Sequence, residues 1–167
     1  MNRQGTVSVA RDRRTPGEDE GHGDLTVRGT WTGHRVARGL VVAGLAVDVY
    51  VHWHLATRLD PVRSSVSPHL TEGQLFRAEA VVALVAAVLV VVVPRWWSAA
   101  LALVVAAGGV AAVLVYSLVD LGAVGPMPDM YDPSWYAEKT LSLVGEAVAA
   151  AAALWWVVAA VRGPRDG

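Results

Sequence analysis

Four ionisable side chains lie inside the long apolar stretches of this sequence: Asp48, His52, Glu79 and Glu146. Asp48 and His52 are spaced i, i+4, so a helix would place them on one face. A carboxylate at the centre of a bilayer costs about 2.5 kcal/mol or more, and it therefore normally faces the interior of a helical bundle. Carboxylates and an imidazole that converge from several helices form metal sites and proton relays. The sequence therefore predicts a pocket that binds or relays a cation or a proton.

A second set of polar residues is predicted at the mouth of that pocket. Glu138, Ser142 and Glu146 follow one another at four-residue intervals, and Tyr116 and Asp120 have the same spacing. At about 1.5 Å of helical rise per residue, all these groups fall in the same half of a bilayer. The predicted mouth residues are Tyr116, Asp120, Glu138 and Ser142.

The same side chains also have a structural interpretation, in which they pair with one another or with Arg77 and Lys139 and fix the helix register. The sequence leaves structural pairing, a proton or ion relay, and a bound metal or cofactor open. Several carboxylates with one histidine suit iron or manganese better than zinc. Haem ligation is disfavoured, because His52 and His54 point to different faces of their helix. The cofactor is unknown at this stage, with a metal ion as the candidate.

The apolar residues determine the fold class. Of the 167 residues 54% are hydrophobic, and they are concentrated in four runs near the 20 residues that an α-helix needs to cross a bilayer. The period-two alternation of a membrane β-barrel is absent. The sequence predicts an all-α, four-helix transmembrane bundle with helices at about 36–57, 72–93, 96–121 and 133–162.

Local signals set these boundaries. Asp60 before Pro61 ends the first helix, and Thr71 with Gln74 has the spacing of a capping box. Asp132 before Pro133 is typical of a helix start. Residues 1–35 are polar and predict a disordered cytoplasmic tail, followed by the transmembrane domain at 36–162 and a cytoplasmic C-terminal tail at 163–167.

The connector at 122–139 is rich in proline, methionine and aromatic residues. It is interpreted either as a lid over the pocket or as an anchor in the membrane interface.

Composition excludes several functional classes. The chain has no cysteine and a net charge of −1, so thiol chemistry and iron–sulfur clusters are excluded and no basic patch indicates nucleic acid. No nucleophile–base pair and no nucleotide-binding glycine loop occurs, so an enzyme is not the favoured interpretation.

Two segments, DVYVHWHLA at 48–56 and GPMPDMYDPSWYAEK at 125–139, resemble small uncharacterised four-helix integral membrane proteins of high-GC Gram-positive bacteria. The resemblance covers about 36–162 and implies a topology without a mechanism. The leading functional hypothesis is a multi-pass protein of the bacterial inner or plasma membrane that binds or relays a cation or proton in its outer leaflet. The alternative is a non-catalytic structural or assembly subunit. The expected partners are the lipid bilayer and either another membrane protein or a second copy of the chain.

Orientation is predicted from the basic residues. Of the 14 lysine and arginine residues, only Arg58, Arg63, Arg77 and Lys139 fall on the side opposite the termini. Because basic residues accumulate on the cytoplasmic side, both termini are expected in the cytoplasm.

A reporter fused after Gly167 should therefore be cytoplasmic, and one inserted at Asp129 extracytoplasmic. Activity of paired reporters that work on opposite sides of the membrane measures this. A cytoplasmic signal from the Asp129 insertion would contradict the orientation.

Overall fold

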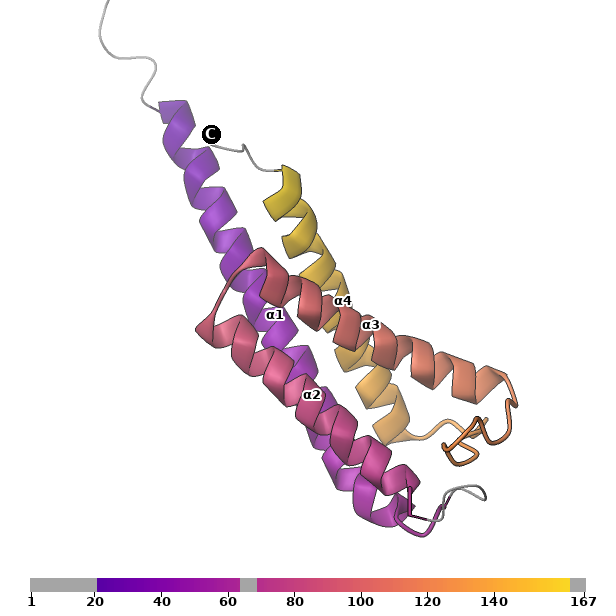
Figure 1. Cartoon of the computed structure of the whole chain (residues 1–167). Coiled ribbons are helices and arrows are strands. Elements are labelled where there is room, and N and C mark those ends of the chain that lie inside the picture. Colours follow the sequence, from indigo (N-terminus) through magenta and orange to yellow (C-terminus); the bar gives the residue numbers. More distant parts are fainter. Residues whose placement is uncertain (1–20, 64–68, 163–167) are drawn as a thin grey trace, which may run out of the picture. The chain divides into compact units, whose positions relative to one another are not determined.

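The computed structural model describes the backbone at residues 21–63 and 69–162, and the side chains of the first helix from residue 33 onward. Four helices make up the described chain: α1 (Gly21–Leu59), α2 (Glu72–Val92), α3 (Trp96–Leu118) and α4 (Ala137–Arg162) (Figure 1). Each contains a segment long and apolar enough to cross a membrane, which in α1 is Gly33–Leu59. The prediction of an all-α protein with four such helices is confirmed.

The helix boundaries differ from the predicted ones at three ends. Helix α1 extends back to Gly21, so residues 21–35 of the predicted tail are helical, because extending an existing helix avoids the cost of nucleating a new one. Helix α3 ends at Leu118 and α4 begins only at Ala137. Asp132 accepts a hydrogen bond from the backbone N–H of Ser134, so Asp132-Pro133 forms a turn. Residues 1–20 and the C-terminal tail at 163–167 lie outside the described residues.

The chain divides into two compact units, Met1–Gly33 and His34–Gly167. The first is described only by its helical backbone from Gly21 onward. The second contains all the side chains predicted to form the pocket and its mouth, and α3 packs along both α4 and α2 within it.

Helices α1 and α4 approach closely at two glycines. A Cβ added to Gly44 would overlap the carbonyl oxygen of Gly145 and lie 2.9 Å from the Cβ of Ala149. A Cβ added to Gly145 would lie 3.0 Å from the carbonyl oxygen of Gly44. Small residues at such crossings let two backbones meet inside a membrane.

An apolar core fills the part of the bundle near the α2–α3 turn. Most of its members are alanines, together with larger side chains from α1, α2 and α4. They are Ala37, Val41, Leu45, Ala83, Ala86, Ala87, Val90, Ala99, Ala102, Ala106, Ala149, Ala152, Ala153 and Trp156. Alanine lets the helices pack closely, and no charged residue belongs to this cluster of described residues.

The junction of α1 and α2 is held by polar contacts. Thr71 forms the predicted capping box with Gln74, since each side chain accepts a hydrogen bond from the other residue's backbone N–H at 3.1 Å. Arg77 donates two hydrogen bonds to Asp60, at 2.8 and 2.7 Å. Gly73 leaves room for the end of α1, because a Cβ there would overlap the carbonyl oxygen of Ala56.

The connector between α3 and α4 folds back on the helix ends. The backbone N–H of Asp132 donates to the carbonyl oxygen of Tyr116 at 3.0 Å. The ammonium group of Lys139, only 11% exposed, donates to the carbonyl oxygens of Asp132 and Ser134 at 2.5 and 3.0 Å. Pro128 is buried. The connector is therefore a folded segment, tied to α3 at one point and to α4 at another.

The glycine crossing gives a stability prediction. Gly44→Ala should destabilise the protein by about 1–3 kcal/mol, because the added methyl group overlaps backbone that cannot turn away. Gly39→Ala is the matched control in the same helix, since nothing lies within 4 Å of its added Cβ, and it should be neutral or stabilising by up to about 1 kcal/mol. Thermal unfolding in detergent measures both. Equal effects of the two substitutions would contradict the close crossing.

Candidate cation site

A buried polar cluster joins α1 to α4. Oδ1 of Asp48 lies 2.6 Å from Nδ1 of His52, and the hydroxyl of Ser142 lies 3.0 Å from the same Asp48 oxygen. Oε1 of Glu146 is 3.2 Å from that hydroxyl. Asp48 and Glu146 are each 1% exposed and the His52 side chain 12%. One ligand atom from each of these three residues lies within 4.8 Å of the others.

Helical spacing and the glycine crossing together place these groups. Asp48 and His52 are one turn apart on α1, as are Ser142 and Glu146 on α4, so each helix presents a short polar stripe. Gly44 lies one turn before Asp48 on the same face of α1. Because the backbones meet there, the two stripes face each other across the contact.

The Glu146 carboxylate also contacts α3. A Cβ added to Gly109 would lie 2.5 Å from Oε1 of Glu146 and 2.9 Å from Oε2, so a larger residue at this position would displace the carboxylate. Oε2 of Glu146 is buried and has no hydrogen-bond partner. A buried oxygen without a partner costs about 1–3 kcal/mol, and more when it carries charge, so this atom is the most unusual one in the site.

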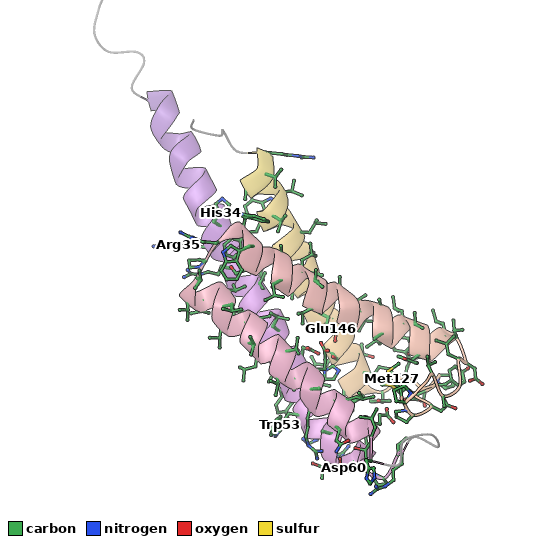
Figure 2. The ribbon with its side chains drawn as sticks, in the orientation of Figure 1. His34, Arg35, Trp53, Asp60, Met127 and Glu146 are labelled. Carbon is green, nitrogen blue, oxygen red and sulfur yellow. The ribbon has the colours of Figure 1, made fainter. Side chains whose placement is uncertain are left out.

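A cavity of about 330 Å³ lies beside the cluster, between α2, α3 and the connector. Its walls include His52, Phe76, Glu79, Gly109, Met127 and Met130. In Figure 2 the labelled Met127 lies in the connector after α3, and Glu146 lies on α4. The cavity therefore brings the connector and the polar cluster to the same part of the bundle.

A smaller cavity of about 100 Å³ is lined by Glu72, Asp132, Tyr136 and Lys139. Four residues line both cavities: Phe76, Ala112, Tyr116 and Met130. The two spaces are therefore neighbours, and the smaller one lies near the ends of α2 and α4.

The basic residues of the structural interpretation are engaged elsewhere. Arg77 pairs with Asp60, and its hydrogen bonds hold the pKa of Asp60 below the usual value. Lys139 lies 3.3 Å from a carboxylate oxygen of Asp132. Within the described ranges 33–63 and 69–162, no lysine or arginine forms an ion pair with Asp48, Glu79 or Glu146.

Glu79 adds another carboxylate to this environment. It lines the larger cavity together with His52 and lies close enough to interact electrostatically with Asp48, His52 and Glu146. Glu79 lies outside the group of donor atoms formed by Asp48, His52 and Glu146, so it is a neighbouring carboxylate on the cavity wall.

The predicted mouth residues separate into three environments. Ser142 is buried inside the cluster, where it links Asp48 to Glu146. Tyr116 lines both cavities. Asp120 is exposed and accepts a hydrogen bond from the backbone N–H of Gly122, while Glu138 lies 3.8 Å from Arg58 at the surface. Neither of these last two lines a cavity described above.

Sequence reasoning missed several residues of the site. Gly109 is part of the site because it has no side chain and so leaves space for the carboxylate of Glu146. The ring of Phe76 packs against the ring of His52, with centroids 4.9 Å apart. Met127 and Met130 line the cavity, although the sequence left open whether the connector is a lid. Paired glycines in an apolar helix were a readable signal for Gly109, but spacing alone did not show which helix it faces.

Comparison of the chain with protein-family models, with curated proteins and with solved structures gives no match.

The contact between Gly109 and Glu146 predicts a coupling between these positions. Gly109→Ala should destabilise the protein by about 1–3 kcal/mol, because the added methyl group displaces the carboxylate. Most of that loss should disappear when Glu146 is also replaced by alanine. Gly108→Ala is the matched control, since nothing lies within 4 Å of its Cβ. A double-mutant cycle on thermal unfolding measures the coupling energy between Gly109→Ala and Glu146→Ala. An equal coupling energy between Gly108→Ala and Glu146→Ala would contradict the contact.

Proposed function

We propose that this multi-pass membrane protein binds a cation, either a metal ion or a proton, at the cluster of Asp48, His52 and Glu146. The observation that supports this most directly is the buried, unpartnered Oε2 of Glu146 beside a second buried carboxylate. In a medium of low dielectric constant, two neighbouring carboxylates that are both ionised repel strongly. A bound cation removes this cost.

The hydrogen bonds within the cluster support the same conclusion. Ser142 has one hydroxyl hydrogen and lies within reach of both Asp48 and Glu146, so it can donate to only one of them. His52 lies against Asp48. Asp48 therefore has two neighbours that can donate. Glu146 has the shared hydroxyl and, if it carries a proton, the adjacent carboxylate of Asp48, while its Oε2 has no partner. Glu146 is the carboxylate that most needs a proton or metal ion.

Access to the cluster supports binding from one end of the bundle. The two neighbouring cavities lie toward the connector, whereas the apolar core fills the bundle toward the α2–α3 turn. A cation would thus enter and leave by the same side. With the orientation predicted from the basic residues, that side is extracytoplasmic.

A structural or assembly subunit is the second candidate. The observation that favours it is the Ser142–Asp48 hydrogen bond, which ties α1 to α4 without any ligand. In this case the cluster fixes the helix register, and the exposed apolar faces contact lipid or another membrane protein.

Unfolding in detergent separates the two candidates. If a cation is bound, the unfolding midpoint of the wild type should rise with added Mn²⁺ or with falling pH. Glu146→Gln should lose this response and remain at least as stable as the cation-free wild type, because it removes the uncompensated charge while keeping the shape. The measurement is thermal unfolding between about pH 5 and pH 9, with and without metal.

Glu138→Gln is the matched control, since Glu138 is a carboxylate of the same helix at the surface. It should keep the wild-type response. A wild type whose midpoint ignores both pH and metal, together with a Glu146→Gln variant destabilised by several kcal/mol, would support the structural role instead.

A further inference from the structure

We infer that the cation is a divalent first-row transition-metal ion, of the Mn²⁺ or Fe²⁺ type, held by Asp48, His52 and Glu146 with Glu79 as a fourth protein ligand. This inference rests on the proposed function and specifies the ligand of the same site. Glu146 is only 1% exposed, and its buried Oε2 has no hydrogen-bond partner. This unpartnered oxygen is the independent sign that the acidic cluster accommodates a ligand.

The spacing of the donor atoms fits a metal ion. Atoms bound to one ion at about 2.0–2.2 Å lie roughly 3–4 Å from one another. The donor atoms of Asp48, His52 and Glu146 already lie within 4.8 Å of one another. Two ligands at i and i+4 of a helix can reach the same ion, which is the relation of Asp48 to His52. A bound ion would require these side chains to adjust from their present spacing, in which Asp48 and His52 lie 2.6 Å apart, to the spacing of a coordination shell.

The donor types narrow the choice of metal. Mg²⁺ and Ca²⁺ prefer sites made of oxygen alone, whereas this cluster includes an imidazole nitrogen. Cu⁺ prefers thiolate and thioether ligands, and the chain has no cysteine. Several carboxylates with one imidazole suit Mn²⁺ or Fe²⁺ best.

Glu79 is the candidate for the fourth ligand, and its side chain would have to turn toward the other three donors, whose close group does not include it. It belongs to α2 and shares the wall of the larger cavity with His52, and it makes no hydrogen bond or ion pair with the part of the chain that the structure describes. Three ionised carboxylates with a neutral imidazole carry a charge of about −3, which a divalent ion reduces to about −1 and a single proton only to about −2. The three carboxylates therefore carry enough negative charge to hold a divalent ion, and neutralising the same amount of charge with protons would take two of them.

The neighbouring cavity is large enough to admit the hydrated ion. Six waters at about 30 Å³ each occupy about 180 Å³, which is less than the cavity volume of about 330 Å³. Glu72 and Asp132 line the smaller cavity next to it and would attract a cation toward the entrance. Water from the cavity can complete the coordination shell on the side that protein ligands leave open.

The test uses the full chain, purified in detergent and stripped of metal with a chelator, and titrates it with Mn²⁺. The electron paramagnetic resonance signal of free Mn²⁺ counts the unbound ion. We expect about one Mn²⁺ per chain, competed by Fe²⁺ but not by an equal concentration of Mg²⁺. Asp48→Asn and Glu146→Gln should weaken binding more than about 100-fold, and Glu79→Gln about 10-fold or more.

Two controls keep the result interpretable. Glu138→Gln should bind Mn²⁺ as the wild type does, and Glu79→Asp, which keeps the carboxylate, should bind better than Glu79→Gln. The metal-free unfolding midpoint of each variant shows whether it is folded. Wild-type affinity in a folded Glu79→Gln variant would overturn the assignment of the fourth ligand.

The outcomes also separate this inference from the proposed function. If Mn²⁺ and Fe²⁺ do not bind, but the pH response of unfolding is present and disappears in Glu146→Gln, the metal inference is wrong and a proton is the cation. Mn²⁺ binding that none of the cluster variants changes would likewise overturn the metal site. If neither metal nor pH affects the wild type, the proposed function itself fails.

Discussion

The close crossing of α1 and α4 is the constraint on which the rest of the site depends. Gly44 and Gly145 let the two backbones meet, and Asp48, one turn along α1, then comes within hydrogen-bonding distance of Ser142. A larger side chain at the crossing would separate the helices and break that contact. The packing of small residues and the chemistry of the cluster therefore have the same physical origin, which is how closely two helices can approach inside a membrane.

The third and second helices complete the environment in different ways. Helix α3 places Gly109 directly against the carboxylate of Glu146, so it confines that group without pairing with it. Helix α2 contributes Glu79 and Phe76 to the cavity wall and keeps Arg77 at the junction with α1, paired with Asp60. The distribution of charge follows from this arrangement: the arginine and lysine near this end of the bundle stabilise the connections, while the carboxylates gather beside the cavity. Negative charge therefore collects beside the cavity, where one buried oxygen of Glu146 has no hydrogen-bond partner.

The connector shows why a sequence pattern can support two interpretations. Its proline and aromatic residues are compatible with either an interfacial anchor or a lid. Met127 and Met130 line the cavity, and Lys139 holds the carbonyl oxygens of Asp132 and Ser134. Trp135 and Tyr136 nevertheless remain exposed, as an interfacial anchor would require. The segment thus contributes Met127, Met130 and Tyr136 to the cavity walls and leaves Trp135 exposed, so both interpretations stay open.

The sequence by itself determined the four helices and which polar residues share a helical face. Runs of apolar residues near the length of a bilayer crossing require helices, because lipid offers the backbone no hydrogen-bond partner, and the i, i+4 spacing placed Asp48 with His52 and Ser142 with Glu146 on shared faces. Local capping signals located the start of α2, whereas Asp132-Pro133 formed a turn instead of the start of α4. Only the tertiary structure decided which faces meet, that Ser142 belongs to the cluster while Asp120 and Glu138 stay outside it, and that Arg77 and Lys139 are paired elsewhere. The physical reason is that helical periodicity fixes which residues are neighbours along one helix. Contacts between helices depend instead on the rotation and approach of each pair. Small residues such as Gly44, Gly109 and Gly145 set that approach, and nothing in their chemistry indicates which helix they will face.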